Sequence, residues 1–134
     1  MDLPDRVLRA MAYQVLAHRG PAFQELATRV LEKVKTIFKT KNPVLVYPCS
    51  GTGAWQAALQ NTLNDGDKIL MFETGEFSRL WHEMATRLGF QAEFVPGDWR
   101  SGVDPAKVSE KLKADKNHDI KAVCIVHHET SGGL

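Results

Sequence analysis

PCSGTGAWQAAL, residues 48–59, follows the apolar run 44–47 and leads into a segment with helical spacing. A continuous apolar run is typical of a strand in a parallel sheet that helices cover on both faces. The short turn Ser50-Gly51-Thr52-Gly53 therefore lies where such a strand ends and a helix begins. A strand that passes through a tight turn into a helix starts a β–α–β unit, which predicts an α/β fold.

The rest of the chain repeats this alternation of strand and helix. Two helices come first, because apolar residues recur at steps of three and four within 5–12 and 22–38. The predicted order is then strand 44–47, helix 52–63, strand 68–72, helix 77–88, strand 91–95, helix 105–114 and strand 121–127. Right-handed connections make these strands part of an open, mostly parallel sheet with helices on both faces.

Composition and charge narrow the class of protein. The 134 residues are 43% hydrophobic and 25% charged, which is ordinary for one soluble domain, and a net charge of +1 gives no basis for nucleic-acid binding. No stretch approaches the ~20 apolar residues of a membrane span. The N-terminus has no signal pattern, so we expect a cytoplasmic protein without a membrane partner. Cys49 and Cys124 lack CxxC spacing, which supports neither a disulfide nor a metal site.

The glycine turn has the chemistry of an anion-binding site. Ligands of open parallel sheets bind beyond the carboxyl ends of the strands, where this turn lies. Free backbone N–H groups at the helix start, the helix dipole and the hydroxyls of Ser50 and Thr52 favour a phosphate. The turn matches neither the Walker P-loop pattern nor GxGxxG. The alternative is structural: Ser50 only caps the helix, and the glycines only let it pack against the sheet.

Four blocks, in this order along the chain, resemble the large domain of class V aminotransferases, in particular the serine–glyoxylate and alanine–glyoxylate branch. They are YPCSGTGAWQAALQNTL (47–63), KILMFETGEFSRLW (68–81), VPGDWRSGVDP (95–105) and IKAVCIVHHETSGG (120–133). The resemblance implies the type I fold of pyridoxal phosphate (PLP) transferases. It implies an N-terminal helical segment at 1–40, an incomplete PLP-binding large domain at 41–134, PLP as the cofactor and a homodimer.

The same resemblance assigns roles to five residues. Ser50, Gly51 and Thr52 match the family's phosphate ligands, in agreement with the anion-binding chemistry of the turn. Phe77 matches the aromatic residue that stacks on the cofactor ring; its helical spacing alone favours a place in the core. Thr130 matches the residue that bonds the phenolic oxygen of the ring, although a hydroxyl at a strand end also commonly satisfies local backbone.

Other conspicuous residues receive structural interpretations. Trp55, Trp81 and Trp99 have no matching family role and are assigned to packing or to an interface. His18 and Arg19 lie in HRGPAF (18–23), which resembles a family segment near the dimer interface and the entrance of the active site. We expect an interface role for them rather than contact with a substrate carboxylate, because a charged loop between helices is usually solvated or bridging.

A metal site at the end of the last predicted strand is not expected. His127, His128 and Glu129 are consecutive and carry ligand atoms. Adjacent residues of a strand point to opposite faces, so His127 and His128, at the end of strand 121–127, would not share one ion. No HExxH spacing is present either.

The family resemblance also shows what these residues lack. A PLP transaminase needs a lysine that bonds the cofactor covalently and an aspartate that keeps the pyridine nitrogen protonated. None of Lys68, Lys107 and Lys121 matches the catalytic lysine, so we assign no catalytic residue within the chain. The 134 residues resemble the N-terminal part of a subunit about three times as long.

The expected function follows from this resemblance. The chain is interpreted as part of an enzyme that moves an amino group from serine or alanine to glyoxylate, and it contributes the phosphate-binding turn and the ring platform. Its substrates are then a small amino acid and a 2-oxo acid. Two alternatives stay open: a non-catalytic module that binds PLP or phosphate, and another class V chemistry such as desulfuration or lyase action.

Overall fold

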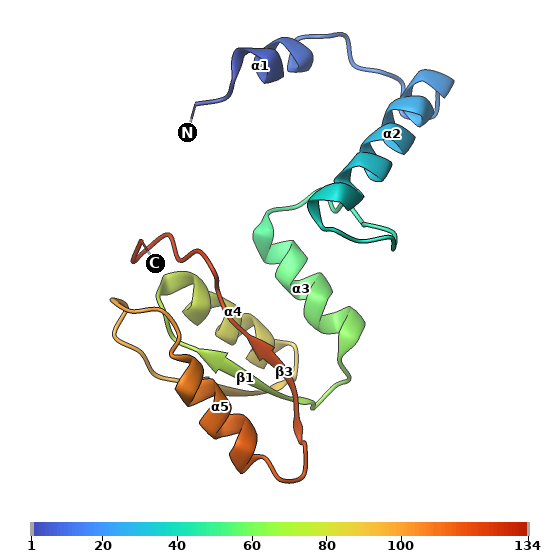
Figure 1. Cartoon of the computed structure of the whole chain (residues 1–134). Coiled ribbons are helices and arrows are strands. Elements are labelled where there is room, and N and C mark those ends of the chain that lie inside the picture. The colour runs from blue at the N-terminus through green and yellow to red at the C-terminus, as the bar shows by residue number, and fades with distance from the viewer. Residues whose placement is uncertain (1, 134) are drawn as a thin grey trace. The chain divides into compact units, whose positions relative to one another are not determined.

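The computed structural model describes residues 2–133. Their contacts divide the chain into two compact units, one ending at Val46 and the other beginning at Tyr47. The first unit contains α1 (Asp5–Met11) and α2 (Pro21–Ile37) (Figure 1). Both predicted helices are confirmed. Neither helix contains a buried residue, so the apolar stripe of α2 is uncovered within its own unit.

The predicted strand at 44–47 is wrong. No strand of the described sheet pairs with these residues. Leu45 and Val46 are 72% and 69% exposed, although the strand prediction rested on their burial. The physical reason is that an apolar run becomes a strand only when a neighbouring strand bonds its backbone N–H and C=O groups.

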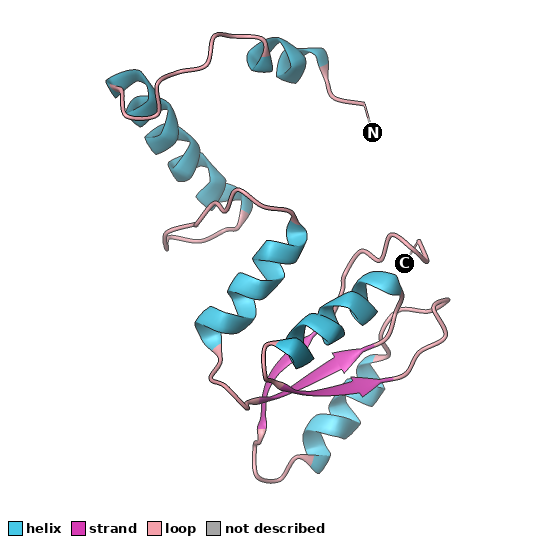
Figure 2. Ribbon diagram, turned by 180° about the vertical axis from the view of Figure 1, so that it is seen from behind, coloured by secondary structure: helices cyan, strands magenta, loops and turns pink. Residues whose placement is uncertain are grey.

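The second unit is an α/β layer structure. Its elements are α3 (Gly51–Thr62), β1 (Lys68–Phe72), α4 (Glu76–Arg87), β2 (Gln91–Val95), α5 (Pro105–Ala114) and β3 (Ile120–Cys124). The described strands form one parallel sheet in the order β2-β1-β3. Figures 1 and 2, taken from opposite sides, show α5 on one face of this sheet and α4 on the other. The predicted parallel sheet with helices on both faces is therefore confirmed.

The core of this unit lies between the sheet and the helices α3 and α4. Ile69 and Leu70 of the central strand β1 have no exposed surface, because strands and helices cover them on every side. Ile69 belongs to a buried cluster with residues from α3, β1, α4, the turn before β2, and β3: Leu59, Met71, Trp81, Ala85, Phe90 and Cys124. Burial raises the pKa of the Cys124 thiol to about 11, and both cysteines are free.

The last strand is shorter than predicted, because β3 ends at Cys124 and not at residue 127. Its final pair joins Cys124 to Met71 of β1. After Phe72 the β1 chain leaves the sheet and turns into the start of α4. Residues 125–127 consequently have no strand beside them to continue the ladder, and their apolar pattern alone cannot make one.

The start of α5 allows a simple test of the predicted N-cap. The Asp104 carboxylate accepts a hydrogen bond of 2.8 Å from the N–H of Ala106, and Pro105 follows at the first helical position. We expect Asp104→Ala to lower the free energy of unfolding by about 1 kcal/mol, measured by urea denaturation. Asp104→Asn keeps a capping oxygen and serves as the control; equal losses in both variants would contradict the capping role.

Candidate functional site

The residues assigned from the sequence line one hollow at the carboxyl edge of the sheet. This hollow has a volume of about 270 Å³, and its walls come from the starts of α3 and α4 and from the segment after β3. The residues that line it are Ser50, Gly51, Thr52, Trp55, Phe77, Val126, His128 and Thr130. All five predicted site residues, the first and last of which are 80 positions apart in the sequence, are thus brought together.

The start of α3 presents free hydrogen-bond donors to this hollow. Ser50 is the N-cap residue, but its side chain makes no capping hydrogen bond. Among residues 2–133, no hydrogen bond uses the backbone N–H of Gly51 or Thr52. A Cβ at Gly51 would meet nothing within 4 Å, so the backbone is open to a ligand there. The alternative that Ser50 serves only as a helix cap is therefore not what the structure shows.

Gly53, by contrast, has the structural role of letting the helix pack closely. A Cβ at this position would lie 2.5 Å from the Cys49 sulfur, so only glycine fits against that side chain. Its own N–H donates to the Ser50 carbonyl at 3.0 Å, which closes the first turn of α3. The turn thus contains one packing glycine and one open glycine.

The donor set of the hollow fits a phosphate group. Two free N–H groups, two hydroxyls and the positive end of the α3 dipole favour an anion of high charge. No aspartate or glutamate is among the residues that line the hollow in the described chain. An anion would therefore meet donors there without facing a carboxylate.

An aromatic wall stands beside the phosphate-binding turn. Phe77 is 38% exposed and lies outside the buried core, unlike Trp81 one helical turn later. Its ring meets the edge of Trp55 with centroids 6.3 Å apart, and Trp55 in turn stacks on Trp81 at 5.0 Å with the rings inclined by 13°. Sequence reasoning left Trp55 and Trp81 to packing, and the structure shows that this packing supports the wall behind Phe77.

Glu129 is the residue that sequence reasoning missed. It is 1% exposed and accepts hydrogen bonds from the backbone N–H groups of Phe77 and Ser78 and from Ser131. Burial by itself raises the pKa of Glu129. The bonds from Ser131, Ser78 and Phe77 outweigh burial and hold the pKa below its ordinary value. Its sequence signal was weak, because nothing local relates this acid to the start of a helix about 50 residues earlier.

His127 and His128 are not strand residues, contrary to the prediction. Both residues lie beyond the end of β3, so they do not alternate across a strand. Their rings meet edge to face with centroids 4.4 Å apart. Within residues 2–133, no group of three or more histidine, cysteine, aspartate or glutamate side chains is arranged to hold a metal ion.

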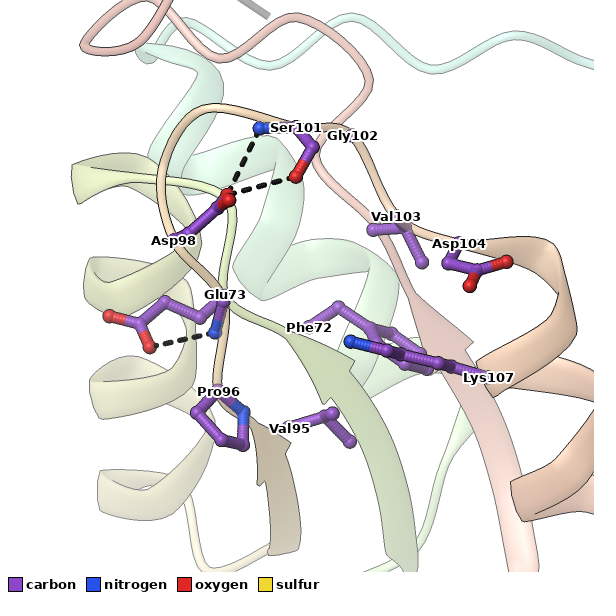
Figure 3. A pocket seen from close by; sticks show the side chains of 11 residues that line it. Phe72, Glu73, Val95, Pro96, Asp98, Ser101, Gly102, Val103, Asp104 and Lys107 are labelled. Carbon is purple, nitrogen blue, oxygen red and sulfur yellow. Dashed lines mark hydrogen bonds between the residues drawn. The ribbon is translucent and has the colours of Figure 1, made fainter.

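A larger hollow of about 530 Å³ lies at the same edge of the sheet, between the ends of β1 and β2 and the start of α5 (Figure 3). Its wall carries three carboxylates, Glu73, Asp98 and Asp104, against one lysine, Lys107. Each carboxylate already accepts hydrogen bonds: Asp98 and Asp104 accept from residues that closely follow them, and Glu73 accepts from the indole N–H of Trp99, in the loop after β2, at 2.9 Å. Hydrogen bonds therefore hold the loops around this hollow, and its excess of negative charge disfavours a phosphate.

The three lysines considered from the sequence lie away from the candidate site. Lys68 begins β1 at the opposite end of that strand and pairs with Glu93 at 2.9 Å. Lys107 lines the larger hollow, and Lys121 donates to the carbonyl of His118. In the described chain, no lysine is among the residues that line the candidate hollow.

Comparison with known proteins identifies the family. The profile of the Aminotransferase class-V family matches residues 6–134. The chain belongs to the class-V aminotransferase family. The serine–glyoxylate aminotransferases of Methylorubrum extorquens and Arabidopsis thaliana are 46% and 44% identical to it, over 99% and 100% of this chain. These alignments cover 33% and 34% of the two relatives, so the chain spans about a third of their length.

Solved structures of aminotransferases share the fold. Alanine–glyoxylate aminotransferase from Nostoc sp. superposes with a TM-score of 0.82 at 27% identity, covering 96% of this chain and 33% of that one. Ureidoglycine–glyoxylate aminotransferase from Bacillus subtilis gives a TM-score of 0.82 at 31% identity, covering 98% and 34%. The resemblance read from the four sequence blocks is confirmed, as is the type I fold. Membership of this family implies pyridoxal phosphate as the cofactor.

The buried carboxylate of Glu129 predicts a specific loss of stability in acid. A carboxyl group with a lowered folded-state pKa stabilises the fold above its ordinary pKa of 4.5, and this contribution is lost as the pH falls through the lowered value. We expect the stability difference between the unmodified protein and Glu129→Gln to shrink between about pH 6 and about pH 3. Urea unfolding at both pH values measures it; a constant difference would show that the carboxyl group does not titrate with a lowered pKa.

Proposed function

We propose that the gene product containing this chain is a PLP-dependent aminotransferase that moves an amino group from serine or alanine to glyoxylate. The observation that carries this proposal is the convergence of Ser50, Gly51, Thr52, Phe77 and Thr130 on one hollow with free donors and no carboxylate. The names of relatives support the substrate class: the serine–glyoxylate aminotransferases are 42–46% identical over nearly the whole chain. A 37% identical relative from Paracoccus denitrificans is named for aspartate as donor.

The residues of the hollow have separate roles in this proposal. The N–H groups of Gly51 and Thr52 and the hydroxyls of Ser50 and Thr52 hold the phosphate of the cofactor at the positive end of α3. Phe77 lies against one face of the pyridine ring and fixes its plane, with Trp55 behind it. The hydroxyl of Thr130 bonds the phenolic oxygen of the ring. The bound cofactor supplies the electron sink for breaking a bond at the amino acid Cα.

The lysine that bonds the cofactor is proposed to be none of the lysines in residues 1–134. The three lysines considered from the sequence lie elsewhere. Lys68 pairs with Glu93, Lys107 lines the larger hollow, and Lys121 donates to the carbonyl of His118. The side chain that anchors the cofactor covalently and exchanges a proton at the substrate Cα is then supplied from another part of the enzyme.

Assembly and location complete the proposal. We propose a homodimer, supported by the apolar stripe on α2 that its own unit does not cover, formed by Phe23, Leu26, Val30 and Ile37. A cytoplasmic location is proposed from the composition of the chain. None of the helices in residues 2–133 combines the length and apolar character needed to cross a membrane.

The test uses the complete gene product, purified and loaded with PLP. Glycine formation from glyoxylate is measured with serine, alanine and aspartate as donors. Serine or alanine is expected to give the highest kcat/KM; a clear preference for aspartate would overturn the donor assignment. PLP binding without turnover of any donor would support a non-catalytic PLP-binding module instead.

The same preparation locates the covalent lysine. Borohydride reduction fixes PLP to the lysine it has bonded, and peptide mapping then identifies that residue. We expect the modified lysine to lie outside residues 1–134. Stoichiometric labelling of Lys68, Lys107 or Lys121 would contradict the assignment of no catalytic residue to this chain.

A further inference from the structure

The start of α4 is held by two side chains from the segment after β3. The first N–H groups of a helix have no partner within the helix and need acceptors from elsewhere. Here the N–H of Glu76 donates to the Ser131 hydroxyl at 2.9 Å. The N–H groups of Phe77 and Ser78 donate to the two carboxylate oxygens of Glu129 at 3.3 Å and 3.2 Å. Three successive N–H groups are thereby satisfied across the fold.

The bonds from Phe77 and Ser78 to Glu129 are partly or fully buried, whereas the bond from Glu76 to Ser131 is exposed. Glu129 is 1% exposed, and its Oε1 also accepts from the N–H and hydroxyl of Ser131, at 3.3 Å and 2.8 Å. A Cβ at Gly75, the residue before α4, would overlap both Glu129 and Ser131, so the two segments pack closely against each other here. On the helix side, the Ser78 hydroxyl accepts from the N–H groups of Thr74 and Gly75.

This contact joins two walls of the candidate hollow. Phe77 bonds Glu129 directly through its backbone N–H, and Thr130 is the residue between Glu129 and Ser131 in the chain. Both Phe77 and Thr130 line the hollow, whereas Glu129 does not. The Glu129 carboxylate therefore connects the aromatic wall to the segment that carries Thr130.

We propose that Glu129 is a positioning residue that fixes Phe77 and Thr130 relative to each other and so sets the orientation of the cofactor ring. This inference rests on the proposed function, because it concerns the cofactor that the hollow would hold. An ionised carboxylate suits the task, since it is purely an acceptor and can take several donors at once. Its negative charge also interacts favourably with the α4 N-terminus.

The experiment compares three variants of the complete gene product. Glu129→Gln keeps the size but turns an NH₂ group toward one of the helix N–H donors, while Ser131→Ala removes only the bond to Glu76 and one bond to Glu129. Glu110→Gln makes the same chemical change at an exposed position of α5 and is the matched control. Three properties are measured: the Kd for PLP, the Kd for inorganic phosphate and the visible circular dichroism per bound PLP.

Glu129→Gln is expected to raise the Kd for PLP about tenfold, which corresponds to ~1.4 kcal/mol, and to halve the circular dichroism per bound PLP, or more. The Kd for inorganic phosphate stays within about twofold, because the donors at α3 are untouched. Ser131→Ala changes the PLP values in the same direction by about threefold, and Glu110→Gln leaves all three properties unchanged. A general loss of folding would weaken PLP and phosphate together, which separates positioning from mere stability.

Three results would overturn the inference, and only the last of them also overturns the proposed function. If the unmodified protein binds PLP and Glu129→Gln binds it with unchanged affinity and dichroism, Glu129 does not position the ring while the proposed function stands. If Glu129→Gln fails to fold, unchanged PLP values in Ser131→Ala overturn the inference in the same way. If the unmodified protein binds no PLP, the proposed function fails and the inference falls with it.

Discussion

Gly51→Asp is expected to weaken PLP binding about 100-fold without destabilising the fold. The position is open, because a Cβ there meets nothing within 4 Å, and Gly51 does not adopt a left-handed conformation. A carboxylate at the α3 N-terminus is itself favourable for the helix by ~0.3–1 kcal/mol. The same charge repels a phosphate dianion, and a penalty of ~2.8 kcal/mol lies within the range for charges about 4 Å apart near a protein surface.

The measurements are a PLP titration and a urea denaturation of the apoprotein. Gly51→Asn is the matched control, since asparagine has the same shape as aspartate without the charge. We expect the asparagine variant to lose at most about tenfold in affinity, because steric interference acts without repulsion. Similar losses in both variants would attribute the effect to size, and unchanged binding in Gly51→Asp would place the phosphate elsewhere.

Gly75→Ala is expected to lower the free energy of unfolding by about 2–3 kcal/mol, the cost of overpacking a tight buried contact. The added methyl group would overlap the Glu129 and Ser131 side chains that hold the start of α4. Glu129 cannot move aside freely, because it is buried and its carboxylate is bonded to Phe77 and Ser78. Backbone strain does not contribute, since the φ of 163° at Gly75 is extended.

Urea denaturation of the two glycine variants Gly75→Ala and Gly102→Ala measures this effect. Gly102 is the control, because a Cβ there meets nothing within 4 Å and its backbone is not left-handed. Its replacement is expected to change stability by less than about 0.5 kcal/mol. If Gly75→Ala is as stable as Gly102→Ala, the contact between α4 and the segment after β3 is looser than the structure shows.

Local sequence patterns predicted most of the elements of the second unit. Three patterns each indicate a local preference of the backbone. They are the apolar run of β1, the apolar stripe of α4 and the Asp104-Pro105 start of α5. The fold agrees with these local preferences, and β1 and β2 lie at the residues that the sequence predicts for them. The phosphate-binding turn was recognisable for the same reason, because its glycines and hydroxyls are contiguous.

Where local patterns predicted the wrong structure, contacts between segments distant in the sequence determined the outcome. The apolar run 44–47 forms no strand and β3 ends at Cys124, because hydrogen bonding to a neighbouring strand, not apolar character, determines where a strand lies. The hydrophobic spacing of α4 placed Phe77 on the core stripe, yet its ring lies at the edge, against Trp55. Helical period gives the direction of a side chain, whereas the neighbouring elements decide what it meets.

By itself the sequence determined the class of fold, the family and the five residues expected around the cofactor. Only the tertiary structure decided how those residues are held. Glu76 and Ser131 are 55 positions apart, and Glu129 bonds two N–H groups of a helix about 50 residues earlier. A buried carboxylate is tolerated only where several donors converge on it. That convergence depends on the folded arrangement of α4 and β3, which no local pattern of residues encodes.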